Sequence, residues 1–305
     1  MTQHDASRQT EPTPVREAEL VSAPTVRRRQ LGRTLRAMRE QLGLKQEDVA
    51  LRTDGAVNRA KLSRIETALT AATAADVGLI LDALDCTEDD LRTSLLKLTR
   101  EGARRGWWQS YRSVLSSAYE DLISLESEAD HLSAWQPTVI PGLLQTGEYA
   151  QQIIAATAMS TAAEDRVDAL VEVRLARQSV LTREAPLNLW AIIGEAALRT
   201  RCTDSQIMYD QLNRLVTMSG RPTITIQVLP SNAAPHVGQM GAFSILGYGT
   251  HADLSVVHVE SLTSALYVEE RTDVAVYQDA VQQLRAAALS VDESRQMIRE
   301  IRDQQ

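Results

Sequence analysis

The sequence predicts a multidomain protein in which an all-α module of five short helices precedes a larger α+β domain, and three observations support this division. Residues 25–136 contain no proline, the strongest helix breaker, and no aromatic residue precedes Trp107. Later segments are β-branched or alternating, as strands are. The chain of 305 residues is about twice the usual length of one domain. We therefore expect a disordered tail at residues 1–25, a helical module at 26–100 and an α+β domain at 105–305.

The tail is predicted from its prolines and polar residues, which leave few large apolar groups to offset the entropy of ordering the segment. The five helices of the module are predicted from apolar residues that recur at helical spacing and from residue types that favour helix ends. The first has a stripe of Leu31, Leu35, Met38 and Leu42 and ends near Gly43, the second covers 46–52, the third follows Asn58 as N-cap with Leu62, Ile65 and Leu69 on one face, the fourth covers 73–84, and the fifth starts at a capping box of Thr87 and Asp90 and runs toward residue 104.

The larger domain is predicted to mix helices and strands, because the period of its apolar residues changes along the chain. Helical patterns fill the domain before residue 182, and from residue 187 onward strand patterns alternate with helical ones. The expected helices cover 111–135, 148–158, 164–181, 205–218, 273–288 and 292–302, and the expected strands cover 187–193, 223–229, 242–246, 254–259 and 266–268.

The charge is distributed unevenly along the chain. Residues 26–70 hold 11 basic and 5 acidic groups, a net charge of +6, whereas residues 71–305 hold 19 basic and 31 acidic groups, a net charge of −12. A basic segment on an acidic chain is typical of a module that binds a polyanion. The absence of aromatic residues before Trp107 disfavours recognition of single strands or RNA, which depends on stacking.

Two short helices joined by a tight turn, inside this basic module, predict a helix-turn-helix. In that motif the second helix lies in the major groove of DNA, and its outer face must carry long donors that reach base edges. Arg59, Lys61 and Arg64 lie on the expected second helix, whereas Leu62 and Ile65 turn inward. Since arginine can donate two hydrogen bonds to guanine, we expect this helix to contact double-stranded DNA.

The segments LGRTLRAMREQLGLKQEDVA (31–50) and NRAKLSRIET (58–67) resemble the xenobiotic-response-element (XRE) type of helix-turn-helix, the family that includes the phage repressors. The resemblance implies a five-helix, lambda-repressor-like domain. It also implies that Arg39 forms an internal ion pair with Glu66, and that Ala50 lets the second and third helices approach. The residues that it assigns to DNA binding are Gln46, which would contact a phosphate, and Asn58, Arg59, Ala60, Lys61, Ser63 and Arg64.

Three positions depart from the pattern of that family. The turn from Thr53 to Val57 is about two residues longer than usual, which leaves the register of the recognition helix open. Ala68 stands where the family has a helix-ending glycine, and Lys45 replaces a short polar cap.

The segment WQPTVIPGLLQTGEYA (135–150) marks a second resemblance, which covers roughly residues 105–290. Together with RLARQSVL (174–181), GEAALRTR (194–201), TIQVLP (225–230) and VVHVESLTSALYVEE (256–270), it resembles the domain that follows an XRE helix-turn-helix in actinobacterial regulators of the WhiJ-like and Scr-type, antitoxin-like groups. The resemblance implies a transcriptional regulator, often encoded beside a small protein that it may bind, and implies no catalytic residue.

The larger domain offers few candidates for chemistry. His236, His251 and His258 are scattered, and two cysteines are too few for a disulfide framework, so we expect no metal and no cofactor. The motifs of hydrolases and nucleotide-binding loops are absent from the sequence, and we expect no catalytic residues and no enzymatic activity. Two groups have an alternative as a ligand site, although ordinary ion pairing or packing is favoured for both: Glu195 with Glu260 and Arg199, and Trp107 with Trp108 and Tyr111.

We therefore expect a cytoplasmic, nucleoid-associated and sequence-specific transcriptional regulator whose larger domain senses an effector or a partner, with no membrane association. A single helix-turn-helix buries little surface, which predicts a homodimer on an inverted repeat with half-sites about 34–36 Å apart. One alternative is an antitoxin-like interaction protein that captures a small basic protein encoded by a neighbouring gene. Another is an enzyme with a DNA-binding anchor.

Overall fold

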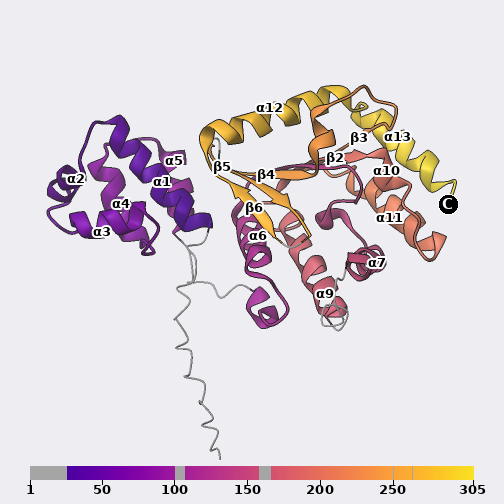
Figure 1. The fold of residues 1–305 in the computed structure, drawn as a ribbon, viewed down its shortest axis with the longest axis horizontal. Coiled ribbons are helices and arrows are strands. Elements are labelled where there is room, and N and C mark those ends of the chain that lie inside the picture. Colours follow the sequence, from indigo (N-terminus) through magenta and orange to yellow (C-terminus); the bar gives the residue numbers. More distant parts are fainter. Residues whose placement is uncertain (1–25, 100–106, 158–165, 250, 263) are drawn as a thin grey trace, which may run out of the picture.

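The computed structural model describes residues 26–99, 107–157, 166–249, 251–262 and 264–305, without the side chains of 251–253. A helical region is followed by a domain with helices and a six-stranded mixed sheet (Figure 1). The predicted fold class, an all-α domain followed by an α+β domain, is therefore confirmed. The tail predicted at residues 1–25 lies outside the described residues.

The helical region forms because five short amphipathic segments each bury one face against the others. Leu35, Val49, Val77 and Leu95, from four different helices, are fully buried in its centre. The helices are α1 (Val26–Gln41), α2 (Gln46–Arg52), α3 (Arg59–Glu66), α4 (Ala74–Ala83) and α5 (Asp89–Leu98).

Two local predictions for the helical region are wrong. The N-cap of α5 is Glu88, which makes no side-chain cap hydrogen bond, and not Thr87. Leu42 and Leu69, placed on apolar faces by their spacing, are 50% and 67% exposed. Both follow the last residue of their helix, so the helical spacing no longer directs them toward the core.

The larger domain is built on a sheet with the strand order β3-β2-β1-β4-β5-β6. The β1–β2 and β2–β3 pairs are parallel, and the β1–β4, β4–β5 and β5–β6 pairs are antiparallel. The strands are β1 (His131–Gln136), β2 (Asn188–Gly194), β3 (Ile224–Leu229), β4 (Phe243–Tyr248), β5 (His251–Glu260) and β6 (Ala265–Val268).

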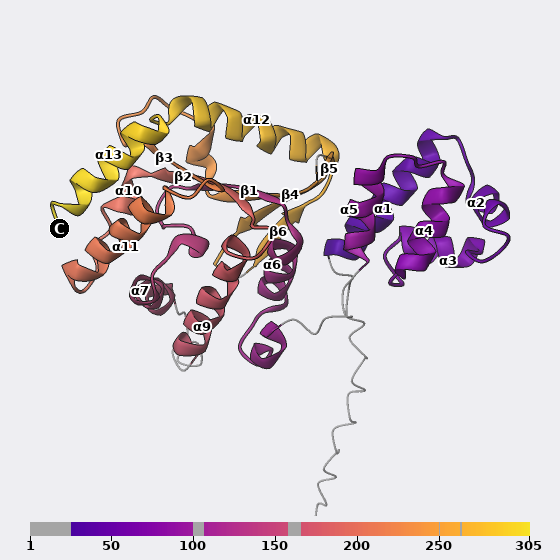
Figure 2. The same ribbon diagram turned by 180° about the vertical axis from the view of Figure 1, so that it is seen from behind.

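Helices cover both faces of the sheet. The helix α12 lies along one face, where Val274, Val281 and Leu284 pack on the strands, and α6, α7, α9 and α11 lie on the opposite side (Figures 1 and 2). Among the described residues, no helix is both long and apolar enough to cross a membrane. The helices are α6 (Ser117–Glu128), α7 (Gly147–Thr157), α9 (Val167–Arg177), α10 (Glu195–Leu198), α11 (Ser205–Met218), α12 (Arg271–Ala287) and α13 (Val291–Arg302), with short 3-10 turns η1 (Trp107–Tyr111), η2 (Gly142–Leu144), η3 (Gln178–Leu181) and η4 (Val237–Met240).

The long helix predicted at 111–135 is wrong in its second half. The helix α6 ends at Glu128, and the strand β1 follows. This strand lies in the middle of the sheet, paired with β2 on one side and β4 on the other, and its Trp135 is buried with Nε1 donating to the carbonyl of Gly238 at 2.9 Å. Pairing partners far away in the sequence therefore override its local pattern.

The two domains meet along the first half of α1. Arg27 donates to the backbone carbonyl of Ser124 in α6, and Gln30 donates to that of Leu254 in β5. The Nζ atom of Lys97 in α5 lies 3.4 Å from the Asp130 carboxylate. Since the second half of α1 belongs to the core of the helical region, α1 links that core to the sheet.

Candidate nucleic-acid interface

The helix α3 follows a defined N-cap. The Asn58 side chain accepts a hydrogen bond from the backbone N–H of Lys61 at 2.9 Å, which satisfies one of the N–H groups that a helix start leaves without a partner. Leu62 and Ile65 are buried beneath the helix, whereas Arg59 and Arg64 are exposed on its outer side. The inward direction of Leu62 and Ile65 and the outward direction of Arg59 and Arg64 are confirmed, whereas Lys61, also expected to face outward, is half-buried.

A buried ion pair connects α3 to α1. Arg39 Nε lies 2.6 Å from Glu66 Oε1 and Arg39 Nη2 lies 3.0 Å from Glu66 Oε2, and the side chains are only 9% and 2% exposed. Gln46 Nε2, at the start of α2, donates to the same carboxylate at 2.7 Å. The hydrogen bond and the charge of Glu66 hold the pKa of Arg39 above its usual value, against the effect of burial. Glu66 therefore fixes α1, α2 and α3 relative to one another.

Close backbone packing brings α1 against the end of α3. A Cβ atom at Gly32 would lie 2.4 Å from the Ile65 carbonyl oxygen and 2.7 Å from that of Glu66, so only glycine fits there without a backbone shift. Ala50 was the small residue expected at a helix contact, and the close contact at Gly32 was not predicted. The position of Gly32 next to Leu31, on the buried side of α1, was the sequence signal that could have indicated this contact.

The backbone of the motif departs from usual helix-turn-helix turns at two points. Asp54 and Gly55 have φ values of 49° and 76°, and this left-handed turn accommodates the extra residues between α2 and α3. The Thr53 hydroxyl accepts from the backbone N–H of Val57 at 3.3 Å and closes the turn. Ala68 has a φ of 60°, the conformation that explains glycine at the matching position of related motifs.

The polar side chains on the outer side of the motif have acidic neighbours. Arg59 Nε lies 2.9 Å from Glu47 Oε1, and both side chains are more than half exposed. Lys61 Nζ lies 2.6 Å from Asp76 Oδ1 at the start of α4. Burial opposes ionisation of Asp76, but the hydrogen bonds from Lys61 and from the helix start keep its pKa below the usual value. The exposed Arg59–Glu47 pair contributes about 1 kcal/mol or less and is easily exchanged for phosphate contacts.

The residues predicted to bind DNA lie together on α2 and α3. Arg59, Ala60 and Arg64 are exposed, as is the cap residue Asn58, and Lys61 and Ser63 are half-buried. The side chain of Gln46, which was expected to contact a phosphate, donates a hydrogen bond to Glu66. The helices α2 and α3 lie on the side of the helical region that faces away from the larger domain (Figures 1 and 2). A DNA duplex can therefore approach α3 without contacting the larger domain.

The candidate polar pocket of the larger domain is not formed. Glu195 pairs with Arg199 at 2.7 Å and accepts from the backbone N–H of Ser231 at 2.9 Å, and the bond from Ser231 together with Arg199 lowers the pKa of Glu195. Glu260 ends β5, which is separated from β2 by two strands. The acids are therefore paired or dispersed.

The aromatic and histidine candidates make packing contacts. Trp107 meets Trp108 edge to face at 5.9 Å, and the Tyr111 hydroxyl donates to Glu172 of α9 at 3.0 Å. His236 packs on Trp135, and His258 packs on Tyr267; the side chain of His251 lies outside the described residues. Across the described ranges, no three His, Cys, Asp or Glu side chains form a group able to hold a metal ion.

The segment of residues 135–150 contains a turn held by buried amides. Gln145 is 1% exposed and accepts from Arg174 Nη1 at 3.1 Å. Gln211 is fully buried, accepts from the backbone N–H of Thr146 at 2.7 Å and donates to the carbonyl of Leu144 at 2.9 Å. These bonds give the turn a structural role at the start of α7.

Comparison with known families follows the same division of the chain. Residues 30–95 match a model described as a helix-turn-helix domain, the region that contains α2 and α3. Residues 119–300 match a model described as a domain of unknown function, DUF5753. The chain belongs to the DUF5753 family. No curated protein and no solved structure matches this member of the family.

Proposed function

We propose that this DUF5753 protein is a sequence-specific transcriptional regulator that reads double-stranded DNA with α3. The observation that carries the proposal is the exposure of Arg59 and Arg64 on a capped helix that faces away from the larger domain. A segment with a net charge of +6 surrounds that helix and supplies attraction for phosphates. The resemblance of residues 31–67 to XRE-type motifs supports the same DNA-binding function.

The experiment is binding-site selection from a random duplex library, followed by anisotropy titration of the selected site. Arg59→Ala or Arg64→Ala is expected to weaken binding by about 1–3 kcal/mol and to relax preference at one base position. Arg299→Ala, which removes the same charge from an exposed position of α13, is the matched control and should bind like the wild type. Selection of no common sequence by the intact chain would refute the proposal.

We further propose that the protein acts as a homodimer on an inverted repeat in the nucleoid. The support is physical: one α3 contacts only a few base pairs, and affinity for a regulatory site needs two copies about one helical turn apart. Moving the half-sites of the selected sequence apart by about five base pairs places them on opposite sides of the duplex and should abolish cooperative binding. Unchanged binding would show that one copy suffices.

A second candidate function is the capture of a small basic protein by the larger domain, as in antitoxin-like regulators. Its support is the net charge of −9 carried by residues 105–305, together with the resemblance to WhiJ-like and Scr-type regulators. In either case we assign binding and not catalysis to this domain. Co-purification with the product of an adjacent gene, and a change in DNA affinity on adding it, would support the candidate.

A further inference from the structure

The strand β6 is left uncovered at one edge of the sheet, whereas the opposite edge strand, β3, is covered. The Val228 N–H in β3 donates to Ser294 Oγ of α13 at 2.9 Å, and the Val228 carbonyl accepts from the Leu289 N–H at 2.9 Å. Along β6, in contrast, β5 is the only described element that packs closely. The outer edge of a strand presents backbone groups that can pair with a further strand, and proteins normally cover or pair such an edge.

The side chains of β6 leave an apolar group in solvent and carry no charge. Leu266 is 60% exposed, whereas Tyr267 points to the other face of the sheet, where its hydroxyl donates to the Ala118 carbonyl at 2.6 Å. Residues 261–268 contain no charged side chain, although residues 105–305 have a net charge of −9. Because like charges that meet at an interface cost free energy, a neutral segment is where two copies of this acidic domain can approach.

The register of the β5–β6 hairpin determines which residues of β6 can bind a further strand. At the turn, the Ser261 N–H donates to the Ser264 carbonyl at 2.8 Å, and the ladder continues from there in antiparallel register. Hydrogen-bonded and non-bonded pairs alternate along such a ladder, so Leu266 forms its hydrogen bonds with β5. The backbone N–H and C=O groups of Ala265 and Tyr267 therefore point outward, away from β5.

We propose that β6 pairs in antiparallel fashion with β6 of a second copy of this chain, about a two-fold axis beside Leu266, so that the two sheets become continuous. Ala265 of each copy then exchanges backbone hydrogen bonds with Tyr267 of the other. The two Leu266 side chains face each other in the non-bonded pair, with Cβ atoms about 5 Å apart. The same residues supply donors and acceptors on both sides, as a two-fold interface requires. This inference rests on the proposed homodimer and assigns its surface.

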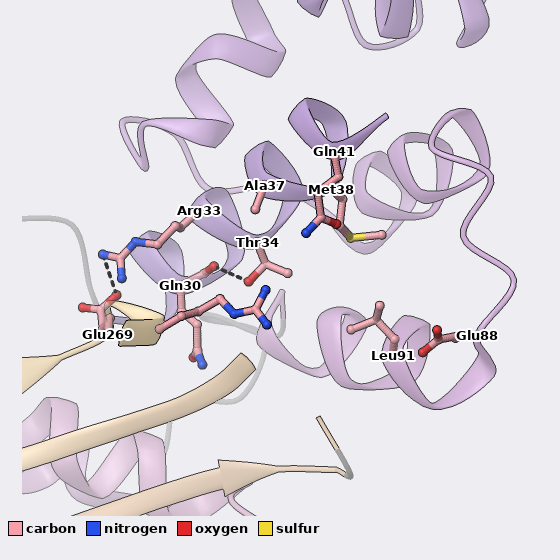
Figure 3. A pocket seen from close by; sticks show the side chains of 10 residues that line it. Gln30, Arg33, Thr34, Ala37, Met38, Gln41, Glu88, Leu91 and Glu269 are labelled. Carbon is pink, nitrogen blue, oxygen red and sulfur yellow. Dashed lines mark hydrogen bonds and ion pairs between the residues drawn. The ribbon is translucent and has the colours of Figure 1, made fainter. Parts of the chain in front are cut away.

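Pairing through β6 also relates the two DNA-binding modules to each other. Glu269 directly follows β6, and Arg29 Nη2 and Arg33 Nη2 of α1 lie 3.0 Å and 3.6 Å from its carboxylate (Figure 3). The side chain of Gln30 in α1 donates to the Leu254 carbonyl in β5. Since α1 also positions α3, the paired β6 strands set the separation of the two reading helices.

The surface is tested by measuring the mass of the intact chain with light scattering over a concentration series, because a short strand gives a weak dimer. The wild type should approach twice the mass of one chain. Leu266→Lys places two like charges opposite each other, and Ala265→Pro removes an outward N–H group, so each should raise the dissociation constant about tenfold or more. Val276→Lys, at a 66% exposed position of α12, is the matched control and should dimerise like the wild type. Circular dichroism verifies that each variant folds.

The register is tested by disulfide cross-linking in a chain that carries Cys86→Ser and Cys202→Ser. Leu266→Cys should form a covalent dimer on mild oxidation, because directly opposed residues of a non-bonded pair lie within disulfide range. Leu262→Cys is the matched control: Leu262 is 80% exposed in the same hairpin, but its two copies would lie about 25 Å apart and should not cross-link.

The outcomes separate the pairing of β6 from the proposed function. Cross-linking at Leu262 and not at Leu266, or a dimer that neither Leu266→Lys nor Ala265→Pro weakens, would overturn the β6 surface and leave the homodimer intact. A wild-type chain that stays monomeric at every concentration but selects a DNA site would overturn the pairing and leave DNA reading intact. A dimer that depends on Leu266 but selects no DNA would support the surface and refute the proposed function.

Discussion

Replacing Gly32 with alanine tests how α1 holds the recognition helix. The new Cβ atom would lie 2.4 Å and 2.7 Å from the carbonyl oxygens of Ile65 and Glu66, where ordinary contact requires at least 3.4 Å. Both neighbours are backbone atoms, so α1 and α3 must separate by up to about 1 Å to restore a contact distance. The matched control is Gly78→Ala in the middle of α4, where a Cβ atom would have nothing within 4 Å.

The two substitutions are expected to change stability in opposite directions. Each gains about 1 kcal/mol from the higher helix propensity of alanine. At Gly32, overpacking against backbone loses about 3 kcal/mol, which leaves a net loss of about 2 kcal/mol. In a module of this size that loss lowers the melting temperature by about 10 °C, whereas Gly78→Ala raises it by about 5 °C.

Far-UV circular dichroism follows the melting of all helices, whereas tryptophan fluorescence follows the larger domain, since all four tryptophans lie beyond residue 106. Gly32→Ala should lower the dichroism transition more than the fluorescence transition, and it should also weaken DNA binding through displacement of α3. If Gly32→Ala stabilised the module as much as Gly78→Ala does, the close approach of α1 and α3 would be refuted.

Three further predictions concern other groups. Arg39→Met leaves Glu66 buried without its main partner and should lose about 3–5 kcal/mol in urea unfolding followed by dichroism; a double variant with Glu66→Met that recovered none of this loss would contradict the ion pair. Burial holds the pKa of His258 at about 4, from 6.5, so the unfolded chain binds its proton first as the pH falls. The larger domain should therefore lose about 3 kcal/mol between pH 6.5 and 4, measured by tryptophan fluorescence, and His258→Gln should flatten this dependence. Glu47→Gln removes a negative charge beside Arg59 and should raise DNA affinity about threefold in anisotropy titrations at low salt; unchanged affinity would place Arg59 away from DNA.

Local signals were sufficient to predict the helices of the DNA-binding module. The bounds of α2 and the Asn58 cap of α3 agree with the prediction, because capping and apolar spacing act within a few residues. The strand β1 was missed, because its partners β2 and β4 begin more than 50 residues away in the chain. The mixed character of the domain was nonetheless predictable from its other strands.

The candidate site was predicted at the level of residues but not of contacts. The outward face of α3 follows from periodicity, whereas the turn of Lys61 toward Asp76 depends on where α4 packs. The ion pair between Arg29 of α1 and Glu269 joins residues more than 200 positions apart, and no local pattern predicts such a contact. Gly32 was overlooked for a similar reason, because its role depends on the end of α3.

The most direct test of α3 as the reading helix is protection of guanine N7 from dimethyl sulfate on the selected DNA site. We expect protected guanines in two half-sites about one helical turn apart, and loss of protection at one position of each half-site in Arg59→Ala or Arg64→Ala. Guanines that remain fully reactive in the wild-type complex, or a protection pattern that neither substitution alters, would contradict base contacts by α3.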